Sequence, residues 1–220
     1  KYSLFEIGRV VDGVKADGTC NERKRLGVVL YDKSGNEKAL YLKAVEIINC
    51  LIGTIKQKKA QYNKIAPEHA WQHPKNTAEI LIDGKKVGVL CAMHPANRAK
   101  LDKTGCAVCF EIDMNDFSSI DANAIKFREP SSQQATWYDL SLVLAENTKY
   151  SDIAACWEAL NIAELDSVKV IDTYENETIK SITIRLVFAS MERTLEMEEV
   201  QSWIDSILAN LGKIGVTIRA

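Results

Sequence analysis

The last third of the chain switches repeatedly between two spacings of apolar residues, and this switching restricts the fold more than any other feature of the sequence. Residues 139–144 and 181–189 place an apolar side chain at every second position, which is typical of a strand buried on one face. Residues 151–160 and 194–211 place them three or four apart, which indicates amphipathic helices. The helical stripes comprise Ile153, Cys156, Trp157 and Leu160, and then Val200, Trp203, Ile204, Ile207, Leu208 and Leu211.

With further strands expected over residues 168–174 and 216–219, the order becomes strand, helix, strand, strand, helix, strand. This is the ferredoxin-like βαββαβ topology, in which two helices cover one face of a four-stranded antiparallel sheet. Ser151 and Thr194 are predicted N-caps, and Gly212 and Gly215 are predicted to end the second helix. The residues expected to face the helices are Leu140, Leu142, Leu144, Ile182, Ile184, Leu186, Phe188, Val216 and Ile218.

The opposite face of this sheet is the candidate binding surface. If Asn176 and Glu177 form a two-residue turn, Asp172 lies opposite Ser181 and Tyr174 opposite Ile179. Asp172, Tyr174, Ser181, Thr183 and Arg185 then share the helix-free face. A tyrosine beside hydrogen-bonding groups on an open sheet can stack on an unpaired base and read its edge. The alternative is a solvated face, or one covered by the rest of the chain.

Residues 1–125 form a second region, in which strands and a helix are mixed. Strands are expected over 4–11, 26–31 and 106–114, and the spacing predicts a helix over 40–55. Residues 78–93 are predicted to form a hairpin around Asp83-Gly84, followed by a short helix from His94-Pro95 to about residue 101. We therefore expect an α+β fold with a mostly antiparallel sheet, then a linker over 126–136, where a proline and polar residues gather, then the domain at 137–220.

The charge, the hydropathy and the cysteine content of the chain bear on its partners and its cellular compartment. The net charge is −2, but Lys and Arg exceed Asp and Glu by 5 over residues 1–136 and fall short of them by 7 over residues 137–220. No stretch approaches the roughly 20 apolar residues of a membrane span, so no membrane partner is expected. The six cysteines mostly sit in apolar runs, as buried thiols do in a reducing compartment, which favours the cytoplasm. The start on Lys1, directly before a strand, is typical of a piece of a longer protein.

Two other groups of residues could in principle carry chemistry. Cys106-x-x-Cys109 could be half of a zinc site, with His69 and His73 as further ligands, although both cysteines fit a strand more simply. His94 could act as a catalytic base, but the sequence ties no nucleophile or carboxylate to it. No glycine-rich phosphate-binding loop is present. We therefore expect no catalytic, metal or cofactor site in this chain.

Read in order, segments along nearly the whole chain resemble the phenylalanyl-tRNA synthetase beta subunit. The strand at 4–10 (LFEIGRV) resembles a strand of the family, and residues 41–46 (YLKAVE) resemble the helix start that follows it. The residues from His73-Pro74 to His94-Pro95 are similar to a paired pattern of the family, and residues 110–113 (FEID) resemble the strand that closes that domain. Further segments resemble the family's ferredoxin-fold anticodon-binding domain: residues 139–143 (DLSLV), 171–175 (IDTYE), 180–182 (KSI), 193–195 (RTL) and 198–200 (EEV).

The resemblance implies a fold and a role. The first domain would be the later part of a class II synthetase-like module without an active site, since the arginines and the glycine-rich motif that adenylation needs are absent. The second would hold the tRNA anticodon through Asp172, Tyr174 and Ser181. The implied partners are phenylalanine tRNA and a synthetase alpha subunit in an alpha2beta2 assembly, and ATP and Mg²⁺ would serve the parent ligase. Trp137-Tyr138 stand where the family usually has an arginine, and the hairpin after Tyr174 is short.

Two other functions fit the same topology. A ferredoxin-like regulatory module would sense a small molecule such as an amino acid. An RNA-recognition-motif protein shares the strand and helix order, but it displays aromatic residues on its third strand, and Phe188 is expected to point into the core.

Overall fold

The computed structural model describes residues 1–125, 133–176 and 179–219. The chain divides into two compact units, residues 1–126 and 127–220. The linker expected over residues 126–136 falls partly outside the described residues, and strand β7 begins at Thr136. No helix in the described ranges is both long enough and apolar enough to cross a membrane.

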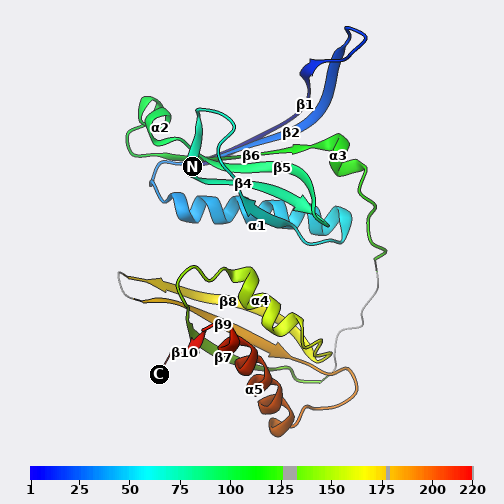
Figure 1. Cartoon of the computed structure of the whole chain (residues 1–220), viewed down its shortest axis with the longest axis vertical. Helices are drawn as coiled ribbons and strands as arrows, with labels where there is room; N and C mark the ends of the chain where they lie inside the picture. Colours follow the sequence, from blue (N-terminus) through cyan, green and yellow to red (C-terminus); the bar gives the residue numbers. More distant parts are fainter. Residues whose placement is uncertain (126–132, 177–178, 220) are drawn as a thin grey trace. The chain divides into compact units, whose positions relative to one another are not determined.

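The first unit is a six-stranded sheet in the order β1-β2-β6-β5-β4-β3, and every neighbouring pair is antiparallel. Helix α1 lies along one face of this sheet (Figure 1). The strands are β1 (Tyr2–Val14), β2 (Cys20–Asp32), β3 (Gln61–Lys64), β4 (Gln72–Ile82), β5 (Lys85–Met93) and β6 (Cys106–Asp113), and the helices are α1 (Glu37–Lys56), α2 (Pro95–Leu101) and α3 (Met114–Ser118). Strand β3 and helix α3 were not predicted from the sequence. They have four and five residues, which is too short to show a periodic pattern of apolar residues.

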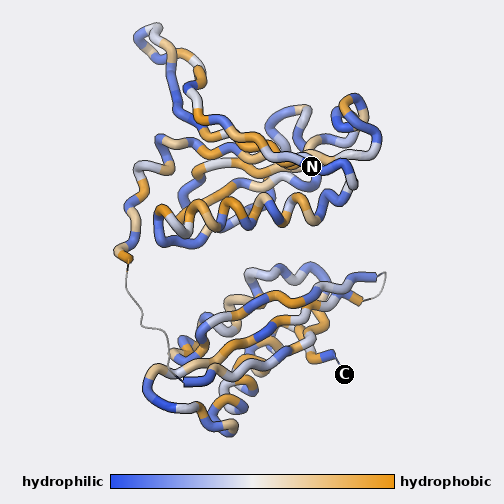
Figure 2. The backbone as a smooth tube through the Cα atoms, turned by 180° about the vertical axis from the view of Figure 1, so that it is seen from behind, coloured by the Kyte–Doolittle hydropathy of each residue, from blue (hydrophilic) through white to orange (hydrophobic). Residues whose placement is uncertain are grey.

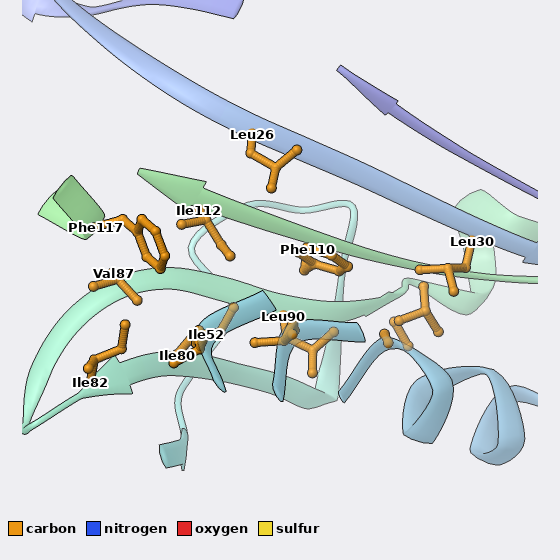
Figure 3. Packing of buried hydrophobic residues seen from close by; sticks show 14 of the residues in the cluster. Leu26, Leu30, Ile52, Ile80, Ile82, Val87, Leu90, Phe110, Ile112 and Phe117 are labelled. Atoms are coloured by element: carbon orange, nitrogen blue, oxygen red, sulfur yellow. The ribbon is translucent and has the colours of Figure 1, made fainter. Parts of the chain in front are cut away.

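The core of the first unit lies between α1 and the sheet. Leu40, Ala44, Ile48 and Ile52 repeat every four residues along α1 and are fully or almost fully buried. Both polar and apolar residues separate them, and α1 shows both colours in Figure 2. From the sheet side, Leu26, Leu30, Ile80, Ile82, Val87, Leu90, Phe110 and Ile112 meet Ile52 and Phe117 in one apolar cluster (Figure 3).

The hairpin between β4 and β5 turns through Asp83 and Gly84, as predicted. Ile82 pairs with Lys85, which leaves these two residues as the loop, and both have positive φ angles, 51° and 76°. Two consecutive positive φ angles are what a type I′ turn requires, and Asp-Gly is among the sequences that adopt it most easily. His94-Pro95 also opens α2 as expected, with the His94 ring accepting a hydrogen bond from the Ala96 amide at 3.1 Å.

The second unit is a four-stranded antiparallel sheet in the order β10-β7-β9-β8. Its strands are β7 (Thr136–Val143), β8 (Leu165–Glu175), β9 (Lys180–Phe188) and β10 (Thr217–Ile218), and its helices are α4 (Tyr150–Glu158) and α5 (Met197–Lys213). Both helices contribute to a single core with the sheet, through Ile153 and Trp157 of α4 and Val200, Ile204, Ile207 and Leu211 of α5. The ferredoxin-like βαββαβ order is therefore confirmed.

Of the strand residues predicted to face the helices, all but Ile218 belong to the core or pack against it, and Ile218 is 53% exposed. Leu142, Ile184, Leu186 and Phe188 are fully buried against the helices, and Phe188 stacks on Trp203 with ring centroids 5.6 Å apart. Phe188 therefore cannot stack on a bound base. An RNA-recognition motif would need an exposed aromatic residue on this strand, so the structure does not favour that alternative.

Three local predictions were wrong. The N-cap of α4 is Lys149 rather than Ser151, because the Asp152 carboxylate accepts the Lys149 amide at 3.0 Å. The N-cap of α5 is Glu196 rather than Thr194, with Glu199 accepting the Glu196 amide at 3.3 Å. In both helices an acidic residue in the first turn accepts the amide of the residue just before the helix, and thereby fixes where the helix begins. Gly212 lies within α5, and only Gly215, at φ 75°, follows its end.

Candidate nucleic-acid interface

The register of β8 and β9 differs from the prediction by two residues. Glu175 pairs with Lys180, and Tyr174 pairs with Ser181 rather than with Ile179. Asp172 consequently lies opposite Thr183 and not opposite Ser181. The connection therefore holds four residues, closed by a hydrogen bond from the Asn176 amide to the Ile179 carbonyl at 2.9 Å. Because a shift of two residues preserves the side-chain alternation, Asp172, Tyr174, Ser181 and Thr183 still share the helix-free face.

Tyr174 is the exposed aromatic residue at one end of this face. The residue is 47% exposed, and the Arg219 guanidinium lies over its ring, 5.5 Å from the ring centroid. The Asn176 side-chain amide donates a hydrogen bond to the Tyr174 hydroxyl at 3.2 Å. Arg219 reaches this position because its amide donates to the Ser141 carbonyl at 2.8 Å, which continues the pairing of β10 beside β7. Arg219 was missed by sequence reasoning, since it is 45 positions away and no local pattern connects the two residues.

Asp172 stands beside Tyr174 on the same strand face. Its carboxylate accepts a hydrogen bond from the Thr173 amide at 2.8 Å, and the side chain remains exposed. A bulge between Val170 and Asp172 separates this part of β8 from the preceding part of the same strand. The bulge changes the alternation, so Val170 pairs with Ile184, whose side chain points toward the helices, while Lys169 pairs with Arg185 on the helix-free face.

Ser181 lies in the middle of the helix-free face, where it is buried rather than exposed. It lies on the central strand β9 between Val143 and Tyr174, and only 6% of the residue is exposed. Its small hydroxyl is flanked by the larger Tyr174 ring on the neighbouring strand. Ser181 can therefore contribute a single hydrogen bond from below, whereas Tyr174 offers a ring face.

A second aromatic residue lies at the other end of the same face. The Arg185 guanidinium sits 4.0 Å above the centre of the Trp137 ring, and Trp137 is 55% exposed. Arg185 also forms two parallel hydrogen bonds of 2.7 Å to the Asp139 carboxylate, which lower the pKa of Asp139. Tyr138, next to Trp137, instead packs on the core with the helices. Of the two residues before Asp139, only Trp137 is on the open face.

The other candidate residues have structural roles. Cys106 and Cys109 are three positions apart on β6, and so point to opposite faces of the sheet; Cys106 belongs to the core beneath α1. The His73 ring accepts the amides of Lys75 and Asn76, both at 3.1 Å, and His69 stacks on Trp71. Among the described residues, no three His, Cys, Asp or Glu side chains are grouped so that they could hold a metal ion.

An antiparallel sheet with helices on one side, and an exposed aromatic ring beside a carboxylate, a hydroxyl and a guanidinium on the other, is an arrangement shared by sheets that bind single-stranded nucleic acids. The comparisons with known proteins give the particular family. Residues 1–114 match the family model described as the phenylalanyl tRNA synthetase beta chain CLM domain, and residues 131–219 match the ferredoxin-fold anticodon binding domain. The chain belongs to the phenylalanyl-tRNA synthetase beta chain family.

Individual relatives agree with the family models. The chain is 31% identical to the phenylalanine–tRNA ligase beta subunit of Hahella chejuensis over 209 residues, which are 90% of this chain and 24% of that protein. It is 25% identical to the beta subunit of Neisseria gonorrhoeae over 228 aligned residues, which cover the whole of this chain and 28% of the relative. The chain thus spans about a quarter of the length of these curated relatives.

Proposed function

We propose that this chain binds the anticodon region of phenylalanine tRNA and supports the assembly of a phenylalanine–tRNA ligase, without performing chemistry itself. The single observation that carries the proposal is the exposed Tyr174 ring, with Asp172, Thr183 and Arg219 around it on the helix-free face. The match of residues 131–219 to an anticodon-binding domain supports the same reading.

Each side chain has a defined part in this proposal. Tyr174 stacks on an unpaired base, because every base presents a π-face and the ring is accessible. Asp172 accepts hydrogen bonds from the donor edge of a base and disfavours an approaching phosphate. Ser181, which is almost fully buried on the central strand, donates or accepts one hydrogen bond. Arg219, already over the Tyr174 ring, can stack on the next base or neutralise a phosphate.

The charge of the second domain limits the affinity that this surface can reach. Residues 137–220 carry 7 Lys and Arg against 14 Asp and Glu. Phosphate neutralisation supplies most of the nonspecific affinity for nucleic acids, and it scales with the number of cationic contacts. Binding by this chain alone is therefore expected to be weak, and to depend only shallowly on salt. In the parent enzyme, other parts of the assembly would supply the remaining cationic contacts.

The first domain would act in assembly. We place it as the later part of a class II synthetase-like module that contacts the alpha subunit, in an alpha2beta2 complex in the cytoplasm. ATP and Mg²⁺ would serve the parent ligase, whose chemistry we assign to the alpha subunit.

Titration distinguishes this function from sensing of a small molecule by the same fold. The chain is titrated calorimetrically with phenylalanine tRNA and, separately, with free phenylalanine. We expect saturable binding of the tRNA and no heat from phenylalanine. A tRNA with the same body and a substituted anticodon loop is the matched control, and its affinity should be lower. Binding of phenylalanine with no binding of tRNA would instead establish the ligand-sensing alternative.

A further inference from the structure

Two thiols face each other in the first unit, although they are far apart in the sequence. Cys91 of β5 and Cys109 of β6 are directly paired across the antiparallel ladder. Their immediate neighbours Leu90, Ala92, Val108 and Phe110 all belong to the core beneath α1, so both thiols lie on the sheet face that α1 does not cover. Directly paired residues of antiparallel strands have Cα atoms about 4.5–5.5 Å apart, which is within the range of about 4.4–6.8 Å found in disulfides.

A cavity gives a small reagent access to this pair. It has a volume of about 690 Å³ and is lined by both thiols, with Val29 and Val89 beside them and Trp71 and Gln72 at the start of β4. Cys109 is partly exposed, while Cys91 is 2% exposed. Apolar residues make up much of the lining, Arg25 and Glu111 form an ion pair at 2.7 Å, and two further carboxylates, Glu6 and Glu68, would repel an anion. A small uncharged molecule therefore fits the cavity better than an ion.

We propose that Cys91 and Cys109 are a thiol pair that a low-molecular-weight disulfide oxidises to a cross-strand disulfide within the folded protein. The Cys109 thiolate attacks one sulfur of the reagent, forming a mixed disulfide and releasing one reagent thiol. The Cys91 thiolate then attacks the Cys109 sulfur, which closes the bond between β5 and β6 and releases the second thiol. The two protons of the protein thiols end on the two released thiols, and the reagent accepts the two electrons.

The order and pH dependence of the two steps follow from burial. Burial raises the pKa of Cys109 to about 11 and that of Cys91 to about 12. The thiolate is the nucleophile, so both steps are slow at neutral pH and become faster as the pH rises toward these values. Cys109 reacts first, because it is the more exposed of the two and its pKa is raised less.

The test uses hydroxyethyl disulfide, a small uncharged disulfide, on a Cys20→Ser/Cys50→Ser background. Those two thiols are exposed and would otherwise consume the reagent. The folded background variant retains four cysteines, and treatment at pH 9 should reduce its titratable thiols from four to two. Proteolysis without reductant, followed by mass spectrometry, should find the Cys91 and Cys109 peptides joined, two hydrogen masses below their sum. The initial rate should be about tenfold lower at pH 8, because the thiolate fraction of a group with so high a pKa falls tenfold per pH unit.

Two further variants serve as controls. Cys106→Ser should leave the loss of two thiols unchanged, because Cys106 points to the opposite face of β6. Cys109→Ser should abolish the linkage. A persistent mixed disulfide on Cys109 with no linkage, a link that involves Cys106, or a Cys91–Cys109 link formed only in denaturant would each overturn the proposal.

Discussion

Tyr174 and its neighbours are the residues on which the proposed function depends. Tyr174 is about half exposed, and its contacts are a guanidinium over one side of the ring and an amide at its hydroxyl. None of these contacts belongs to the apolar core of the domain. Binding and stability should therefore respond independently to substitution at this position.

Tyr174→Ala is expected to weaken tRNA binding by roughly 1–3 kcal/mol, the usual cost of removing one base-stacking aromatic residue. The melting temperature should hardly change, since substitutions on an open surface usually alter stability by within about 0.5 kcal/mol. Filter binding at fixed salt, together with thermal melts, measures both quantities. Tyr150→Ala is the matched control, because Tyr150 is similarly exposed at 46% but lies on α4. Unchanged tRNA affinity with a sharp fall in melting temperature would make Tyr174 a packing residue.

Asp172→Ala should change selectivity more than affinity. A carboxylate reads donor groups on a base edge, so its removal should reduce the difference between the cognate tRNA and one with a substituted anticodon. Loss of a negative charge near phosphates should at the same time leave overall binding unchanged or slightly stronger. Competition filter binding between the two tRNAs gives the ratio directly. If the ratio is the same in Asp172→Ala and in the wild type, Asp172 does not read the anticodon.

At the scale of elements, the ferredoxin-like domain depends on strands that are each apolar on one side. Ile184 lies on the central strand β9, is fully buried, and faces α4 and α5. Ile184→Ala removes three carbon atoms from a packed core and should lower the free energy of unfolding by about 2–5 kcal/mol. Val170, its partner on β8, is 46% exposed, and Val170→Ala should cost within about 0.5 kcal/mol. Urea denaturation of the two variants gives the comparison, and equal losses would show that this assignment of the core is wrong.

At the scale of the whole molecule, the two units have separate cores and no described group suited to adenylation chemistry. The purified chain should not exchange pyrophosphate into ATP in the presence of phenylalanine. The measurement is incorporation of labelled pyrophosphate, with a boiled sample as the blank and an intact phenylalanine–tRNA ligase as the positive control. Exchange above the blank would contradict the non-catalytic role proposed here.

Local pattern was sufficient for the elements whose periodicity is long and regular. The stripe of α5, the alternation of β9 and the Asp83-Gly84 turn all follow from interactions within a few residues, so the sequence determined them. Helix starts were less predictable, because an acidic residue in the first turn fixes the start, as Glu199 does in α5, where Thr194 was the expected N-cap. The shared side of the sheet on which Asp172 and Tyr174 lie was also predictable, since side chains alternate regularly from Asp172 to Tyr174, beyond the bulge.

Tertiary structure alone decided which distant residues meet. Arg219 reaches Tyr174 only because β10 pairs with β7, and Cys91 faces Cys109 only because β5 and β6 pair in one particular register. The sequence drew attention to Cys106 and Cys109 because they are close along the chain, yet the pleat of β6 sends them to opposite faces. A contact across a ladder is set by the register of two strands, which depends on turn length and on the packing of the whole sheet. The sequence by itself therefore determined the elements and their faces, whereas strand pairing determined the composition of each site.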